Sequence, residues 1–248
     1  MNKLYKGDCL EVMKQIPSGS IDAIITDPPY GTTACKWDSV IDFDLMWEQL
    51  NRIIKPNGAI VLFGSEPFSS ALRMSNINNY RYDWIWNKTK GGGFALANKM
   101  PLKRHECLSV FYKKLPTYNP QKTKVAEHLI DKRKTINNSK SSSIVSPVQK
   151  GAIRKKDDGT RFPTTSLNFS SVSMGKHPTQ KPVVLMEYLI KTYTNENETV
   201  LDFTMGSGST GVAAKNLNRN FIGIEMDDKY FDIATERINK EEPQKELF

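Results

Sequence analysis

The chain contains 248 residues, of which 38% are hydrophobic, 10% aromatic and 25% charged. This length and apolar content suit one globular domain with a proper core and a small insertion, and they exclude disorder throughout. The longest apolar run, Ala59–Phe63, fits a buried strand and is too short for a membrane span. The N-terminus lacks the apolar core of a signal peptide, and the three cysteines match neither a disulfide framework nor a zinc spacing. We therefore expect a cytoplasmic protein without a metal site.

Positive charge is concentrated in one segment of the chain. Residues 113–176 contain 14 Lys or Arg and 4 Asp or Glu, a net charge of +10, whereas the remaining 184 residues have a net charge of −2. The basic segment is rich in Ser, Thr, Asn and Pro, which predicts either a small inserted subdomain or a segment that orders on its partner. Its charge suits a solvated loop or a surface that follows the phosphates of a nucleic acid.

In the rest of the chain, short apolar runs alternate with amphipathic stretches, as in a parallel sheet covered by helices. Strands are predicted at Ile21–Thr26, Ala59–Gly64, Tyr82–Trp86, Cys107–Tyr112, Thr199–Phe203 and Asn220–Glu225. Helices are predicted at Phe43–Ile54, Pro67–Ser75, Val183–Tyr193, Ser209–Leu217 and Lys229–Lys240. Turns are predicted at Pro17–Gly19 and Pro56–Gly58. The predicted fold is an α/β, Rossmann-like, doubly wound and mostly parallel sheet with helices on both faces.

The first of two unusual strand ends is Asp27-Pro28-Pro29-Tyr30, directly after the strand that begins at Ile21. Ligands of open α/β sheets bind beyond the carboxyl ends of strands. The prolines end the strand and remove two amide donors, which leaves backbone carbonyls as acceptors. Acceptors beside an aromatic ring suit a planar group with an –NH2, such as a nucleobase edge. A proline turn with a capping aspartate is the structural alternative.

The second strand end is glycine-rich. Gly206, Gly208 and Gly211 satisfy the pattern G-x-G-x-x-G after a predicted strand, and Glu225 ends the next strand 19 residues after Gly206. The glycines predict close approach of the backbone to a ligand, and Glu225 predicts a ribose diol in that ligand. Taken alone, this pattern suggests NAD and hence a dehydrogenase.

With both strand ends considered, the chain resembles the amino-methylating DNA methyltransferases that use S-adenosylmethionine. It resembles their permuted beta group, in which the catalytic motif precedes the cofactor motif. Asp27–Tyr30 matches the catalytic tetrad, and Asp202–Thr210 is similar to the family's D-P-F-x-G-S-G-T-T loop, with Phe203 in place of proline. Gly223–Glu225 matches the ribose-binding strand end. The resemblance covers about three quarters of the chain, everything except the basic segment.

Two further segments extend the resemblance and lead to a division of the chain. His177–Pro182 is similar to the stretch before the first helix of the cofactor half, and Gly7–Cys9 lies where the family has a carboxylate near the adenine amine. The basic segment falls where the family has its target-recognition region. The implied domains are a catalytic half at 1–112, the target-recognition insert at 113–176, a cofactor-binding half at 177–240 and a charged tail at 241–248.

The resemblance also implies residue roles. Asp27 and the Pro28 carbonyl would accept hydrogen bonds from the two N–H groups of the target amine, and Tyr30 would stack on a base rotated out of the duplex. Lys181, with His177 and Thr179, would lie toward the carboxylate of the cofactor, and Asp202 would hold its ammonium. The implied S-adenosylmethionine contacts are Asp8, Cys9, Asp27, His177, Thr179, Lys181, Asp202, Gly206, Gly208, Thr210 and Glu225. DNA contacts are predicted at Lys132, Arg133, Lys134, Arg154, Lys155 and Lys156.

The predicted activity is site-specific methylation of the N6 amine of adenine in DNA, in a bacterial or phage restriction-modification setting. Asp at the first tetrad position is commoner among the family's adenine enzymes, and N4-cytosine methylation is the alternative. Three rival functions are a non-catalytic DNA-binding module, a protein-glutamine methyltransferase and a dehydrogenase.

Several weaker signals keep two interpretations each. Tyr118, Phe162 and Phe169 suit either base stacking or anchoring of the basic segment on the body. Gln244, Leu247 and Phe248 form a C-terminal pattern that resembles peptides that dock on bacterial sliding clamps, and packing back on the domain is the alternative. The oligomeric state is left open.

Overall fold

The computed structural model describes residues 2–32, 38–130, 157–172 and 180–240. In chain order the α-helices are α1 (Cys9–Met13), α2 (Phe43–Ile53), α3 (Phe68–Ser75), α4 (Val183–Tyr193), α5 (Ser209–Asn216) and α6 (Asp228–Lys240). The strands are β1 (Asn2–Lys6), β2 (Ile21–Thr26), β3 (Ile54–Gly64), β4 (Tyr80–Gly92), β5 (Lys103–Phe111), β6 (Thr123–Lys124), β7 (Thr160–Arg161), β8 (Ser166–Asn168), β9 (Thr199–Asp202) and β10 (Asn220–Glu225). Two 3₁₀ turns lie at Phe94–Leu96 and Glu127–Leu129.

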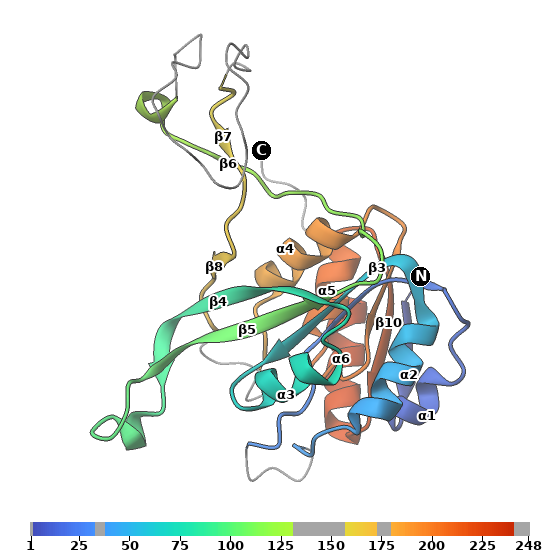
Figure 1. Ribbon diagram of the computed structural model, residues 1–248. Helices are drawn as coiled ribbons and strands as arrows, with labels where there is room; N and C mark the ends of the chain where they lie inside the picture. Colours follow the sequence, from blue (N-terminus) through green and yellow to red (C-terminus); the bar gives the residue numbers. More distant parts are fainter. Residues whose placement is uncertain (1, 33–37, 131–156, 173–179, 241–248) are drawn as a thin grey trace. The chain divides into compact units, whose positions relative to one another are not determined.

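Eight of the described strands form one sheet in the order β1-β10-β9-β2-β3-β5-β4-β8 (Figure 1). The five strands from β1 to β3 are parallel, and β5 pairs antiparallel with both β3 and β4. The sheet is therefore mostly parallel, which confirms the predicted fold class. The β4–β5 hairpin continues beyond the helix-covered part of the sheet (Figure 1).

Two apolar cores cover the two faces of the sheet, because successive side chains of a strand point to opposite faces. In β2, Ala23 and Ile25 pack in the core that α4, α5 and α6 complete, whereas Ile24 packs with α1, α2 and α3. Burial on both faces explains why the central strands are continuous apolar runs rather than alternating ones.

The predicted elements agree with the observed ones within one or two residues at most ends. The strand predicted from Cys107 begins at Lys103, and the short strands β6, β7 and β8 were not predicted. The turn predicted at Pro56–Gly58 lies inside β3, where the pairing with β2 shifts between Ile21 and Ala23. The strand predicted at Tyr82–Trp86 runs from Tyr80 to Gly92, because pairing with β5 supports a sequence with weak apolar periodicity. The exposed edge strand β1 and the short helix α1 were not predicted, because neither contains a long apolar run.

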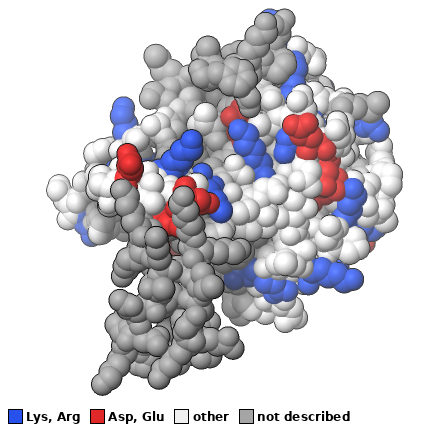
Figure 2. All heavy atoms as spheres, turned by 90° about the horizontal axis from the view of Figure 1, so that it is seen from above, with Lys and Arg blue, Asp and Glu red and all other residues white. Residues whose placement is uncertain are grey.

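The described chain divides into two compact units, residues 1–119 with 164–248, and residues 120–163. In the smaller unit β6 pairs with β7, Arg161 pairs with Asp157 at 2.8 Å, and Lys122 lies 4.5 Å from the Phe162 ring centre. On the face shown in Figure 2, basic and acidic side chains are interspersed over the described surface. Within the described residues, no helix has the length and apolarity required to cross a bilayer.

Candidate active site

The two predicted strand ends lie side by side at the centre of the sheet. β2 and β9 are paired in parallel, with Ala23 opposite Val200 and Ile24 opposite Leu201. β2 is followed in the chain by β3 on one side, and β9 is followed by β10 on the other side. The strand order therefore reverses between β2 and β9. Such a switch point opens a crevice at the carboxyl ends of the strands. Asp27 and Asp202 are located there.

Asp27 lies between a hydroxyl and an ammonium group. The Tyr30 hydroxyl donates to its Oδ1, and Lys181 forms an ion pair with its Oδ2. Burial raises the pKa of Asp27, while the Lys181 charge opposes that rise. Lys181 was predicted to lie toward the carboxylate of a cofactor, and in the structure its ammonium contacts Asp27 of the tetrad.

The loop after the tetrad is held by Asp38. Its Oδ1 accepts from the backbone N–H groups of Tyr30 and Gly31, at 2.7 and 2.9 Å, and its Oδ2 accepts from Thr32 at 2.9 Å. The Tyr30 ring also packs on Phe68 of α3, with ring centres 5.0 Å apart. The chain downstream of the tetrad therefore fixes the direction of the Tyr30 hydroxyl.

Asp202 ends β9 and is only 4% exposed. Its Oδ1 accepts from the Thr26 hydroxyl and from the Thr204 N–H, and its Oδ2 accepts from the Thr210 hydroxyl. Burial raises the pKa of Asp202 to about 6, although these hydrogen bonds oppose the rise. Thr26 belongs to β2, so Asp202 ties the two strand ends together.

Glu225, at the end of β10, accepts three backbone N–H groups. Oε2 accepts from Gly206 at 2.9 Å, and Oε1 accepts from Met226 and Asp227 at 3.0 and 2.8 Å. Asp8, at the end of the neighbouring β1, caps α1 through its Oδ1. Both carboxylates are therefore placed by backbone amides.

The glycine turn is shaped largely by packing. A Cβ on Gly208, whose φ is +80°, would lie 3.0 Å from the Ala234 Cβ of α6, and one on Gly211 would lie 2.4 Å from Ile238. Close packing of α5 on α6 thus requires glycine at these two positions. Gly206 has a φ of +51° and lines a cavity.

Two cavities meet at Asp27. The larger, of about 200 Å³, is lined by Asp8, Cys9, the tetrad, Phe203, Thr204, Glu225 and Tyr230, among others. The smaller, of about 40 Å³, is lined by Asp27, Lys181, Asp202, Gly206 and Thr210, among others. Burial, with Asp8 nearby, raises the pKa of Cys9 to about 12, so its thiol is neutral. The crevice thus combines carboxylate acceptors with aromatic surface.

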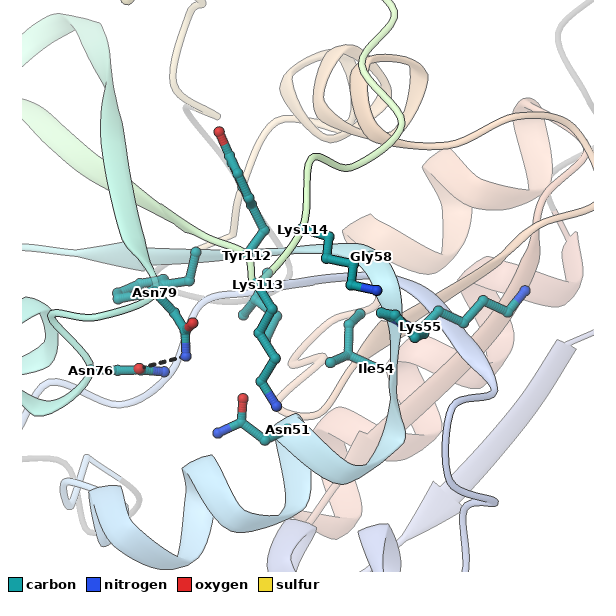
Figure 3. Close-up of a pocket in the computed structure, with 12 residues that line it drawn as sticks. Asn51, Ile54, Lys55, Gly58, Asn76, Asn79, Tyr112, Lys113 and Lys114 are labelled. Carbon is teal, nitrogen blue, oxygen red and sulfur yellow. Dashed lines mark hydrogen bonds between the residues drawn. The ribbon is translucent and has the colours of Figure 1, made fainter.

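A separate cavity of about 170 Å³ lies at the amino end of β3 (Figure 3). Lys55, Lys113 and Lys114 surround it, and Asn79 donates to Asn76 across 2.9 Å at one side. It contains none of the predicted site residues.

The structure brings together eight of the implied cofactor contacts, from four strand ends and the segment before α4: Asp8, Cys9, Asp27, Lys181, Asp202, Gly206, Thr210 and Glu225. Tyr118 packs against Tyr193 and Phe169 against Tyr188, both on α4, which favours the anchoring interpretation for these two aromatic residues. Gly208, the remaining described cofactor candidate, lines neither cavity. The predicted residues that lie outside the described ones are His177, Thr179, Lys132, Arg133, Lys134, Arg154, Lys155, Lys156, Gln244, Leu247 and Phe248.

Sequence reasoning missed several residues that build the site. The hydroxyl oxygens of Thr26 and Thr204 lie 2.9 Å apart, and Thr204 donates to the Asp27 carbonyl at 3.1 Å. Asp38 and Glu106 were missed as well. Thr26 and Thr204 lie next to and within the two predicted motifs, whereas the contact of Glu106 with Lys181 joins segments 75 residues apart.

A parallel sheet with carboxylates and a glycine turn at its switch point defines an α/β enzyme of the nucleotide-cofactor-binding class. The sequence model of the N6/N4 DNA methylases matches residues 21–236, and the chain belongs to this family of DNA amino-methyltransferases. It is 31% identical over 277 residues to the type II methyltransferase M.HinfI of Haemophilus influenzae, a match that covers 98% of this chain and 70% of that protein.

Solved structures agree with this membership. The M1.HpyAVI–SAM complex matches with a TM-score of 0.63 and 29% identity, over 96% of this chain and all of that one. The cytosine-N4-specific PvuII DNA methyltransferase matches with a TM-score of 0.68 and 18% identity, over 98% of this chain and 89% of that one. The second similarity concerns the fold alone.

Proposed function

We propose that this DNA amino-methyltransferase transfers the methyl group of S-adenosylmethionine to the N6 amine of adenine at a specific DNA sequence. The observation that carries the proposal is the position of Asp27, a carboxylate at the switch point that lines both cavities. Asp as the first tetrad residue supports adenine. The similarity in fold to a cytosine-N4 enzyme keeps cytosine as the second candidate, because both amines need the same acceptors.

The residues of the crevice fit the proposed cofactor. Glu225 and Asp8 offer acceptors for ribose hydroxyls and the adenine amine, and Phe203 offers an aromatic face in the same cavity. Asp202 is placed to accept from the ammonium of the methionine portion, near the Gly206 turn. When bound, S-adenosylmethionine supplies an electrophilic methyl group on a sulfonium centre.

The target amine is a poor nucleophile because its lone pair is delocalised into the ring. Asp27 and the Pro28 carbonyl would accept hydrogen bonds from its two N–H groups. These hydrogen bonds favour tetrahedral geometry at the nitrogen and free its lone pair for attack. Tyr30 would contribute its ring to the base and its hydroxyl to the position of Asp27. Catalysis would then depend on positioning and electrostatics, with no covalent enzyme intermediate.

DNA recognition is assigned to the basic segment. The proposed domains are those predicted from the sequence, with target recognition in 113–176 and phosphate contacts at the six basic residues of 132–134 and 154–156. The names of the type II relatives support a restriction-modification role. Docking of the C-terminal residues on a sliding clamp is a further hypothesis, tested by a pull-down with residues 244–248 deleted, in which unchanged clamp binding would disprove it.

The function is tested by nucleoside mass spectrometry on DNA from cells that express the chain, beside an Asp27→Ala variant. We expect N6-methyladenine only with the intact tetrad. N4-methylcytosine would keep the mechanism and overturn the base assignment. No methylated nucleoside from soluble, folded protein would contradict the proposal.

A further inference from the structure

A buried ion network extends from Asp27 to residues that the proposed chemistry does not use. Lys181 is 8% exposed, and its Nζ contacts two carboxylates, Asp27 Oδ2 and Glu106 Oε2, the latter at 3.6 Å. The Phe63 ring lies 5.2 Å from the same ammonium. An ammonium so enclosed is held by its two anions, because little solvent remains to stabilise it.

Glu106 is in turn held by a neighbouring strand. It lies on β5 opposite Trp86 of β4, and its Oε1 forms an ion pair with Lys88, two residues further along β4. The order of contacts is Lys88, Glu106, Lys181, Asp27, with alternating charges. The first two residues belong to the β4–β5 hairpin, whereas Lys181 belongs to the segment that enters α4.

The charges within this network reinforce one another. Burial lowers the pKa of Lys181, but Asp27 and Glu106 outweigh that effect and raise it. Burial raises the pKa of Glu106, but Lys181 and Lys88 outweigh that effect and lower it. For Asp27, burial and the Glu106 charge outweigh Lys181 and raise the pKa, and the Lys181 charge opposes that rise.

We propose that Glu106, fixed by Lys88, is a positioning residue that holds the Lys181 ammonium against Asp27 and so keeps this carboxylate ionised and oriented for the target amine. The proposal rests on the proposed amino-methyltransferase function. It assigns Lys181 to the catalytic carboxylate rather than to the cofactor.

The direct test is a ¹³C-carboxyl NMR titration of the full chain without ligand, with the Asp27 signal identified by its loss in Asp27→Asn. Replacement of Lys181 by Met should raise the Asp27 midpoint by about 1 to 3 pH units. Adding Glu106→Gln to that variant should lower the midpoint again, because it removes the Glu106 charge, which raises the pKa of Asp27. Tyr30 and Asp202 also interact with Asp27 and are unchanged throughout. An Asp27 midpoint unmoved by Lys181→Met would overturn the proposal.

Kinetics provide a second readout. In the wild type, Glu106→Gln should lower kcat about tenfold with little change in KM for S-adenosylmethionine, because Lys181 loses one of its two anchors. In the Lys181→Met background the same substitution should increase turnover near pH 6 to 7, a change of sign that a merely structural role does not produce. Glu66→Gln, which breaks the exposed Glu66–Arg73 pair, is the matched control and should leave kcat unchanged.

The outcomes separate this proposal from the proposed function. Lys181→Met that weakens S-adenosylmethionine binding in calorimetry, with the Asp27 midpoint unmoved, would place Lys181 in the cofactor site and overturn the proposal. Absence of DNA methylation by the wild type would overturn the function itself, and the NMR result would then describe only a buried ion network. Circular dichroism melting identifies any variant that fails to fold. Lys181→Arg, which keeps the charge, should have the Asp27 midpoint of the wild type.

Discussion

The carboxylates at the two central strand ends are held in contrasting ways. Asp202 accepts from one backbone N–H and two threonine hydroxyls, one of them on β2, and Glu225 accepts from three backbone N–H groups. Asp27 is held by the end groups of two long side chains, Tyr30 and Lys181, and the second of these comes from a segment 154 residues away. The proposed cofactor corner is thus held by backbone amides and short threonine side chains, whereas the proposed catalytic corner is held by long side chains.

The difference matches what each corner has to do. Backbone amides stay in place whether or not a ligand is present, so an amide-held carboxylate is preorganised for a constant ligand. A carboxylate held by long side chains can exchange one partner for another when a substrate amine arrives. We infer that the free energy of cofactor binding depends mainly on the fold, and that turnover depends on the ion network.

The largest expected effect follows from breaking the catalytic corner. Asp27→Asn should lower turnover by about 10²- to 10³-fold, because the amide is neutral and loses one of the two acceptor oxygens. Cofactor affinity should change by less than about threefold, since the cofactor corner is untouched. Single-turnover kinetics and calorimetry measure the two quantities. Asp22→Asn, on the same strand but paired with Lys55 at 2.6 Å, is the control that should keep normal turnover.

A change in the proposed cofactor corner should weaken cofactor binding more than it slows turnover. Glu225→Gln should weaken S-adenosylmethionine binding by about 10- to 100-fold, the range for loss of a hydrogen bond to a charged group. Calorimetry tests this directly. Glu198→Gln is the matched control, because Glu198 also accepts a backbone N–H, from Asn195 at 2.7 Å. Equal losses in both variants would mean that the effect is one of stability rather than binding.

A pH titration tests how protonation of Asp202 affects stability and cofactor binding. Its pKa is about 6 in the folded protein, above the 3.8 of a free carboxyl, so the folded state binds more protons between these values. The contribution of this group to the free energy of unfolding should therefore increase as the pH falls below 6. Affinity for the cofactor should change in the opposite direction, by about tenfold for each pH unit below 6, because the neutral acid no longer has the negative charge that pairs with an ammonium. Calorimetry from pH 5 to 8 tests this, and Asp202→Asn should abolish the dependence.

The smallest effect is expected at Asp38. Asp38→Asn should reduce the free energy of unfolding by about 1 kcal/mol, because one amide oxygen replaces two carboxylate oxygens that accept three N–H groups. Asp42→Asn is the control: Asp42 caps α2 through one oxygen at 3.0 Å, and asparagine caps helices about as well. Chemical denaturation measures both. An equal loss in the two variants would show that Asp38 is an ordinary cap.

The sequence alone determined the elements and the family. Long apolar runs such as Ile21–Thr26 and Asn220–Glu225 had nearly correct bounds, because burial on both faces leaves a strong local signal. The tetrad and the glycine turn marked both strand ends, because their chemistry lies in consecutive residues. The exposed edge strand β1 left no such signal.

Only the tertiary structure decided which distant groups meet. The contact of Lys181 with Asp27, the bridge from Asp202 to Thr26 and the place of Glu106 beside Lys181 all join residues separated by 75 positions or more. Strand order creates these contacts, and it is set by the packing of helices on a sheet rather than by local preference. The ends of the strands could therefore be predicted from residues adjacent in sequence, whereas the groups that contact their carboxylates could not.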